Sequence, residues 1–224
     1  MAVALEQSVL TAAHRVAAAL GDEPAAIYVV GSAAVSEFEA GRSDLDMVAV
    51  FHRQLPRPEI EGVVERVLDV DVSPARVLEL VVYAAGELVL NLNTRCAGSA
   101  DDPRVEYGPR EDEWFWFVID RAIAEQHAYV LSGAPWRDVF PATSRENVLK
   151  ALEASLHWHA MHRPRDRNTL LNALRARHYV ETGEWISKRE AQERLLTETL
   201  ALVSGGRGGT PEASARPSPR RESF

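Results

Sequence analysis

"GSAAVSEFEAGRSDLDMVAV", residues 31–50, places a Gly-Ser pair ahead of two aspartates that a single leucine separates, and an apolar run follows. If this run is a β-strand, Asp44 and Asp46 point to the same face, because side chains alternate along a strand with a period of two. Two carboxylates so close together repel each other. A divalent cation between them would offset the repulsion, and Mg²⁺ that also carries substrate phosphates suits such oxygen ligands. The stretch therefore predicts a metal site where a buried strand begins.

A turn that could hold phosphate precedes the aspartates. Gly31 is expected to end a strand, and Ser32 to open a short helix over residues 33–40. The first N–H groups of a helix have no partner within the helix and attract anions such as phosphate. A phosphate-binding turn and a metal site would then face each other.

A third acid follows in a later strand-like stretch. Glu79 is the only acid in the apolar run RVLELVVYA, residues 76–84, and burying its charge without a partner would be costly. If its strand turns Glu79 toward Asp44 and Asp46, the three carboxylates form a site for nucleotidyl transfer. Glu79 could then deprotonate a hydroxyl nucleophile. The alternative is an edge strand on which Glu79 faces water.

The composition is that of a globular protein with a core, since 46% of the 224 residues are hydrophobic. The net charge of -8 argues against nucleic acid as a partner, because phosphate binding needs a basic surface, and favours a cationic substrate.

The cysteine content and the N-terminal stretch indicate the compartment. The single cysteine, Cys96, cannot form an internal disulfide, which fits the reducing cytoplasm. Residues 5–20 have the spacing of an amphipathic helix rather than a signal peptide, and no apolar run is long enough to span a membrane.

The predicted secondary structure changes near residue 110. Up to that point, apolar and β-branched runs alternate with turns and helical stretches, and after it the signals are helical. We expect a domain with strands and helices over residues 1–110, a helical domain over residues 111–204, and a disordered tail of Gly, Pro, Ser and Arg over residues 205–224. The predicted strands cover residues 26–31, 45–51, 75–84 and 88–94, and a helix covers residues 57–70.

The helical half has recognisable helix ends. A Ser or Thr followed three residues later by Glu is typical of a capping box, and a glycine often ends a helix in the left-handed conformation. These patterns predict helix starts at Thr143 with Glu146 and at Ser187 with Glu190, and a helix from near Asp166 to Gly183.

Two stretches resemble a known family. GSAAVSEFEAGRSDLD, residues 31–46, resembles the Gly-Ser and Asp-x-Asp signature of the DNA polymerase β-like nucleotidyltransferase superfamily. RNTLLNALRARHYVETGEWISKREAQERL, residues 167–195, resembles a segment of the aminoglycoside adenylyltransferases that modify streptomycin and spectinomycin. The superfamily at large lacks this second segment, so the resemblance, which covers roughly residues 25–196, points to the narrower family.

The resemblance implies an α+β fold, with a polymerase β-like nucleotidyltransferase domain built on a mixed sheet and a C-terminal all-helical domain. In that family the two domains close on ATP, Mg²⁺ and the drug, and two Mg²⁺ ions are expected. Carried over by motif, Gly31, Ser32 and Ser43 would contact the triphosphate, Asp44 and Asp46 would bind the metal, Glu79 would be the catalytic base, and Arg175 and Lys188 would reach the ATP phosphates from the helical domain.

The acceptor is defined by fewer residues. Family members that accept streptomycin have a tryptophan after the strand that follows the base, whereas residues 88–96 here read LVLNLNTRC. They also have acids just before the second segment, where HRPRDRN, residues 162–168, offers Asp166 as the candidate substrate contact in otherwise basic surroundings.

We therefore expect Mg²⁺-dependent transfer of AMP from ATP to a hydroxyl of a small cationic substrate, with release of pyrophosphate. An aminoglycoside of the streptomycin or spectinomycin type is the first candidate, which would make the protein a monomeric, cytoplasmic antibiotic-resistance enzyme. The alternatives are a nucleotidyltransferase of this fold that acts on another small molecule or a protein, and a non-catalytic, antitoxin-like binding module.

Overall fold

One mixed sheet of six strands, in the order β5-β4-β3-β2-β1-β6, forms the centre of the computed structural model. β2 and β3 run parallel, and the other neighbouring strands are antiparallel. The structure describes residues 5–21, 23–85, 90–96, 104–108 and 114–205. The strands are β1 (Pro24–Val29), β2 (Leu45–Phe51), β3 (Leu78–Ala84), β4 (Leu90–Cys96), β5 (Arg104–Tyr107) and β6 (Tyr129–Gly133).

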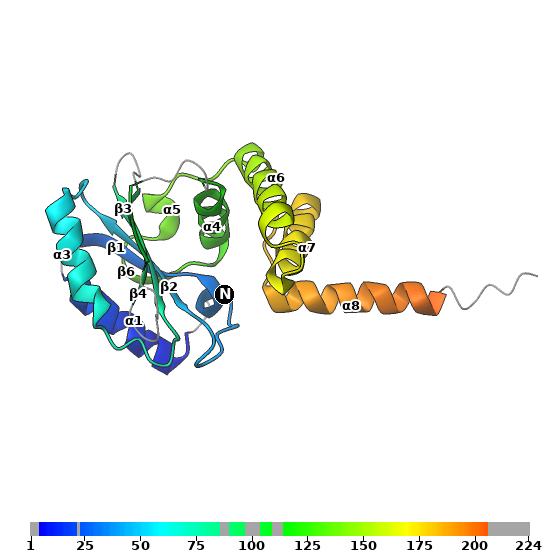
Figure 1. The fold of residues 1–224 in the computed structure, drawn as a ribbon, viewed down its shortest axis with the longest axis horizontal. Coiled ribbons are helices and arrows are strands. Elements are labelled where there is room, and N and C mark those ends of the chain that lie inside the picture. Colours follow the sequence, from blue (N-terminus) through cyan, green and yellow to red (C-terminus); the bar gives the residue numbers. More distant parts are fainter. Residues whose placement is uncertain (1–4, 22, 86–89, 97–103, 109–113, 206–224) are drawn as a thin grey trace, which may run out of the picture.

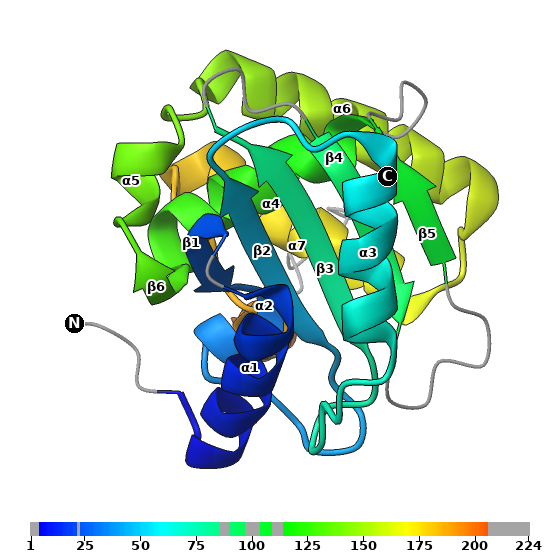
Figure 2. The same ribbon diagram turned by 90° about the vertical axis from the view of Figure 1, so that its left-hand side faces the viewer.

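Helices cover both faces of this sheet (Figures 1 and 2). Because side chains alternate along β2, Met47 and Ala49 pack in the core on one face, and Val48 and Val50 pack on the other. The first face is covered by α1 (Gln7–Leu20) and α3 (Arg57–Leu68), and the second by α4 (Trp114–His127) and α5 (Trp136–Val139).

Three long helices form a further layer beyond α4. They are α6 (Arg145–His162), α7 (Arg167–Thr182) and α8 (Lys188–Gly205), and α8 projects away from the rest of the molecule (Figure 1). Apolar side chains of α4 and α6 share a core, which includes Phe115, Ile119, Val148 and Leu152. The α+β fold predicted from the sequence, with a mixed sheet and a helical C-terminal region, is confirmed.

The predicted helix ends are confirmed with one exception. The Ser187 N–H donates to Glu190 Oε2 at 2.9 Å, and the Glu190 N–H donates to Ser187 Oγ at 3.1 Å. Gly183 ends α7 in the left-handed conformation with a φ of 79°. The prediction of a capping box at Thr143 is wrong, because α6 begins one residue later and Ser144 Oγ accepts the N–H of Asn147 at 3.2 Å. Serine is the stronger N-cap of the two.

The four predicted strands correspond to β1 to β4, and two more were not predicted. β5 is short, and β6 lies after the predicted boundary at residue 110, where it pairs antiparallel with β1. The chain therefore adds β6 to the sheet, and α4 and α5 to one of its faces, before it forms α6 to α8. The predicted disordered tail, residues 205–224, lies outside the described residues except for Gly205, the end of α8. Within the described ranges, no helix combines the length and apolarity needed to cross a membrane.

Candidate active site

A cleft of about 1050 Å³ opens between the sheet, α4 and the helices α7 and α8. Its walls come from segments that are far apart in the sequence. The predicted site residues that line it are Gly31, Ser32, Ser43, Asp44, Asp46, Glu79, Arg175 and Lys188. The fold thus brings the predicted phosphate turn, the acids and the cations of the helical layer together in one cavity.

The acids converge because of the register between β2 and β3. In this parallel pair Asp46 is the direct partner of Glu79. Side chains at partnered positions of a sheet point to the same face, so both carboxylates face the cleft. Asp44 lies two residues before Asp46, just ahead of β2, and also lines the cleft.

The backbone at Gly31 packs directly against Asp46. Gly31 has a φ of 64°, a conformation that favours glycine, and a Cβ there would overlap the carboxylate of Asp46. The Val30 N–H donates to the backbone carbonyl of Asp46 at 2.9 Å, which joins the turn to β2. α2 covers only Gly31–Ala34, so the helix predicted over residues 33–40 is wrong in extent; Ser36, with a φ of 58°, turns the chain instead.

Two arginines offset part of the negative charge. Arg76 Nε and Nη2 donate to Asp44 Oδ1 and Oδ2, each at 3.0 Å. Arg95, the cross-strand partner of Glu79 on β4, places its Nε 3.4 Å from Glu79 Oε1. Asp44 is therefore held in a two-point ion pair, which fixes the direction of its carboxylate.

The negative charge that the arginines do not offset, together with burial, raises the pKa values of Asp46 and Glu79. Burial and the negative charges of Glu79, Asp44 and Asp120 raise the pKa of Asp46 well above its ordinary value. Burial and the charge of Asp44 also raise the pKa of Glu79, although Arg95 acts in the opposite direction. A cationic ligand among these carboxylates would favour their ionised forms.

Asp44 and Asp46 are the residues of the cleft that could hold a metal ion. Among the described residues, no group of three or more His, Cys, Asp or Glu side chains is placed to hold a metal ion. Mg²⁺ commonly takes one or two protein carboxylates and completes its shell with phosphate oxygens and water. Asp44 and Asp46 offer two such carboxylates, with Asp44 shared with Arg76.

Two cations face the acids from the helical layer. Arg175 Nε donates to the Ile186 carbonyl at 2.7 Å, which orients its guanidinium, and Lys188 Nζ donates to Asn168 Oδ1 at 3.3 Å. Burial lowers the pKa of Arg175, and burial together with the charge of Arg175 lowers the pKa of Lys188. A bound anion would favour the charged form of both groups.

Ser43 and Asp166 have defined partners. Ser43 Oγ accepts the Glu39 N–H at 2.9 Å, so its hydroxyl proton remains available for a phosphate oxygen. Asp166, the predicted substrate contact, caps α7 through an Oδ1 that accepts the Asn168 N–H at 2.8 Å, and it is not among the described residues that line the cleft. Its structural role as a cap explains its position, and we leave it out of the proposed site.

Asp120 and Arg121 line the cleft from α4 and were not predicted. They are the only charged residues in WFWFVIDRAI, residues 114–123, a run whose apolar character indicates a core helix. The signal that identified Glu79, a lone acid in an apolar run, also marks Asp120. Arg121 Nε is buried and has no hydrogen-bond partner among the described residues, and the guanidinium carbon lies 5.3 Å from the centre of the Phe140 ring.

Asp120 is expected to make stability depend on pH. Water reaches it through the cleft, but the surrounding protein atoms and the charge of Glu79 raise its pKa from 3.8 to about 6. The folded protein therefore holds this proton more tightly than the unfolded chain, and the stability gained below pH 3.8 is lost as the pH rises through about 6.

Replacing Asp120 with asparagine should consequently raise Tm relative to wild type above pH 6 and leave it nearly unchanged at pH 4. Thermal unfolding in a buffer with chelator measures this difference. Asp69→Asn, at the exposed C-cap of α3, is the matched control. A difference between D120N and wild type that stays constant from pH 4 to pH 8 would contradict the prediction.

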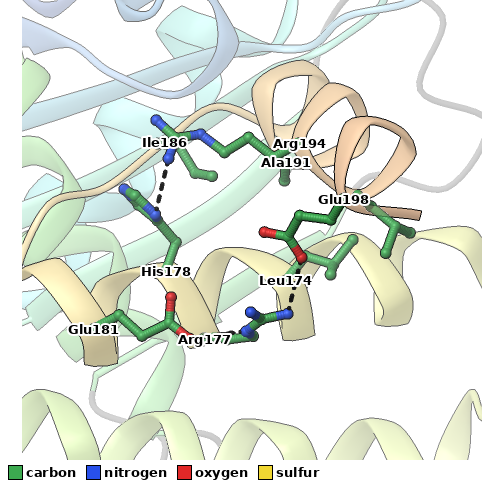
Figure 3. A pocket seen from close by; sticks show the side chains of 9 residues that line it. Leu174, Arg177, His178, Glu181, Ile186, Ala191, Arg194 and Glu198 are labelled. Atoms are coloured by element: carbon green, nitrogen blue, oxygen red, sulfur yellow. Dashed lines mark hydrogen bonds and ion pairs between the residues drawn. The ribbon is translucent and has the colours of Figure 1, made fainter. Parts of the chain in front are cut away.

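A second hollow lies between α7 and α8 (Figure 3). Its volume is about 70 Å³, so it holds little more than water. Arg177 on α7 crosses it, with Nη1 3.3 Å from Glu198 Oε2 on α8, and also pairs along α7, with Nε 2.9 Å from Glu181 Oε1. The larger cleft is therefore the candidate active site.

Comparisons with known proteins support the fold. No protein-family model matches the chain, and no curated protein matches it in sequence. Among solved structures, the chain is similar to spectinomycin adenyltransferase AAD(9) from Enterococcus faecialis, whose structure was determined with ATP and spectinomycin. The TM-score is 0.62 at 16% sequence identity, and the match covers 91% of this chain and 92% of that one. The chain thus shares the fold of that solved structure over nearly its whole length.

Proposed function

We propose that this protein transfers AMP from ATP to a hydroxyl group of a small cationic acceptor, in the presence of Mg²⁺, and releases pyrophosphate. An aminoglycoside antibiotic of the streptomycin or spectinomycin type is the first candidate acceptor. The observation that carries the proposal is that Asp44, Asp46 and Glu79 face Arg175 and Lys188 across one cleft. A fold shared with an adenyltransferase that was solved with ATP supports it further.

The triphosphate would lie between two sets of donors. Gly31 and Ser32 offer backbone N–H groups from the turn after β1, and Ser43 adds a hydroxyl. Arg175 and Lys188 offer charge-assisted hydrogen bonds from the opposite wall. Contacts from both walls would hold the α-phosphorus close to the acids, and such positioning supplies a large part of the rate in phosphoryl-type transfer.

Glu79 is the proposed general base. The acceptor hydroxyl attacks the α-phosphorus in line with the leaving pyrophosphate, so that one oxygen–phosphorus bond forms as the other breaks. The hydroxyl proton passes to the Glu79 carboxylate. Burial and Asp44 raise the pKa of Glu79, which makes its carboxylate a stronger base than an exposed one.

Asp44 and Asp46 are the proposed metal-binding residues. Mg²⁺ held by these carboxylates would neutralise triphosphate charge and polarise the phosphate oxygens. The contacts of Arg76 with Asp44 and of the Gly31 backbone with Asp46 keep both carboxylates in place before any ligand binds.

The side of the cleft beyond Glu79 is suited to an amine. Asp120 lines it from α4, and Glu106 lines it from β5, where its Oε2 accepts the side-chain amide of Asn93 at 3.1 Å. Carboxylates around a hydroxyl-binding site favour an acceptor that carries ammonium or guanidinium groups. This supports the aminoglycoside class over neutral sugars.

Transfer assays with ATP labelled at the α-phosphate or at the γ-phosphate test the proposal. The acceptor panel includes streptomycin, spectinomycin, other hydroxylated amines and neutral polyols. A hydroxylated amine should acquire the label from the α-phosphate and not the label from the γ-phosphate. One equivalent of pyrophosphate should be released for each acceptor molecule that is modified. ATP binding without transfer to any acceptor would favour a binding module instead.

Arg175→Ala and Lys188→Ala should each weaken ATP binding by about tenfold or more, because each removes a charge-assisted contact worth roughly 1.5 to 3 kcal/mol. Calorimetry with MgATP gives the dissociation constants. Arg177→Ala is the matched control, since Arg177 lies on the same helix but is paired with Glu181 and Glu198. Wild-type affinity in both R175A and K188A would remove the helical layer from the nucleotide site.

A further inference from the structure

Glu37 connects the turn after β1 to the helical layer. Its carboxylate accepts two hydrogen bonds from Arg189 at the start of α8: the backbone N–H donates to Oε2 at 3.4 Å, and Nε donates to Oε1 at 3.3 Å. The two residues are 152 positions apart in the sequence. Both line the cleft, so the contact spans its two walls.

The position of Glu37 is fixed on the side of the sheet. Its own N–H donates to the carbonyl of Ser32 at 2.9 Å, within the turn proposed to hold phosphate. The next residue, Phe38, packs against the core under α1 and α3. The Glu37 side chain is only 13% exposed, whereas that of Arg189 is 68% exposed. Glu37 is therefore the fixed partner, and Arg189 adapts to it.

On the other wall, the contact lies where α8 begins. A carboxylate at a helix N-terminus is favoured by the unpaired N–H groups and the helix dipole, so the Glu37 contact with the Arg189 N–H adds to the ion pair. Lys188 is the preceding residue. Glu37 fixes the distance between the Arg189 backbone and Ser32. Because Lys188 is bonded to Arg189, the same contact fixes the distance between Lys188 and the turn that contains Ser32.

We propose that Glu37 is a positioning residue that sets the separation between the two halves of the triphosphate site. This inference rests on the proposed function, because it assumes that Ser32 and Lys188 bind the same triphosphate. Glu37 itself would not contact the reacting atoms. It would act through Arg189 on Lys188, and its charge also favours the protonated form of Arg175.

An ordinary surface ion pair would contribute little, because exposed pairs are typically worth less than about 1 kcal/mol. The contact of Glu37 with a backbone N–H distinguishes a positioning role from a simple ion pair. Arg189→Ala removes the side-chain contact and leaves the backbone contact, whereas Glu37→Ala removes both. The positioning role therefore predicts a larger effect for E37A than for R189A, and a simple ion pair predicts equal effects.

The test compares E37A, E37D and R189A with wild type in three measurements. The KM for ATP should rise about tenfold in E37A with kcat within about threefold, rise less in R189A, and be partly restored in E37D. Hydrogen exchange of the Arg189 amide in the ligand-free protein should be faster in E37A. Tm should change little, because Glu37 lines the cleft and belongs to none of the hydrophobic cores. Glu198→Ala, which removes an α7–α8 ion pair outside the cleft, is the control.

The readouts separate this inference from the proposed function. If wild type neither binds ATP nor transfers AMP, the proposed function is wrong, whatever hydrogen exchange shows. If wild type is active and E37A exchanges the Arg189 amide faster but keeps the wild-type KM, the positioning role is wrong. Equal increases in KM for E37A, R189A and E198A would indicate general loosening of α8 and would also overturn it.

Discussion

Replacing Asp46 with asparagine is expected to lower AMP transfer by about 10³-fold or more, the upper range for removing one preorganised electrostatic contact in an enzyme. The carboxylate lies between Gly31, Glu79 and the cleft, where its charge would bind the metal that accompanies the triphosphate. Asparagine keeps the shape of the side chain and one oxygen but loses this charge.

The fold of D46N should be retained. The charge of Asp46 is buried among other acids, which raises its pKa, so the neutral amide removes a repulsion at neutral pH. Tm should therefore equal or exceed that of wild type, while single-turnover transfer at saturating MgATP falls. Asp138→Asn, an exposed acid on α5 that does not line the cleft, is the control. Near wild-type transfer in D46N would rule out the metal role of Asp46.

Replacing Glu79 with glutamine should lower kcat by about 10²-fold or more, the usual contribution of a general base. Affinity for ATP should change little, because Glu79 is proposed to act on the acceptor and not on the nucleotide. Glutamine keeps an oxygen that can face Arg95, and the ladder of backbone hydrogen bonds does not depend on the charge, so the register of β3 and β4 should remain intact.

The pH profile distinguishes a base from a structural carboxylate. The pKa of Glu79 is raised, and only the ionised form can take a proton, so kcat/KM in wild type should rise with pH through that raised value. In E79Q this rise should be absent. A profile with the same rising limb in E79Q would assign the base to another group, and Asp120 on α4 would be the next candidate.

The sequence alone was sufficient to predict β1 to β4, including β2 with Asp46 and β3 with Glu79. Their apolar, β-branched runs indicate strands without ambiguity. A lone acid within such a run indicates a functional side chain. Which strands are neighbours, and in what register, depends on long-range pairing that no local pattern encodes. The direct opposition of Asp46 and Glu79 is therefore a result of the structure.

The elements that were missed have weak or competing local signals. β6 is a short strand after a long helix, none of its residues is buried, and its place beside β1 follows from tertiary pairing. Thr143 and Ser144 compete for the same cap, and local spacing alone favours the wrong one. Asp120 and Arg121 were overlooked because their run matches a buried helix, and only the arrangement of α4 over the sheet turns them into the cleft.

The pairing of β6 with β1 also determines how this chain could be cut into fragments. A fragment that ends near residue 110 would leave the edge of β1 bare and remove Trp136 and Phe140, whose rings lie 4.9 and 6.3 Å from that of Tyr28. Bare edges and exposed aromatic surface promote aggregation. A fragment that ends after Phe140 keeps every strand of the sheet together with the acids, and leaves Arg175 and Lys188 on the complementary piece. Split at that point, the protein would become a two-component system in which neither half holds both the three acids and the pair Arg175 and Lys188.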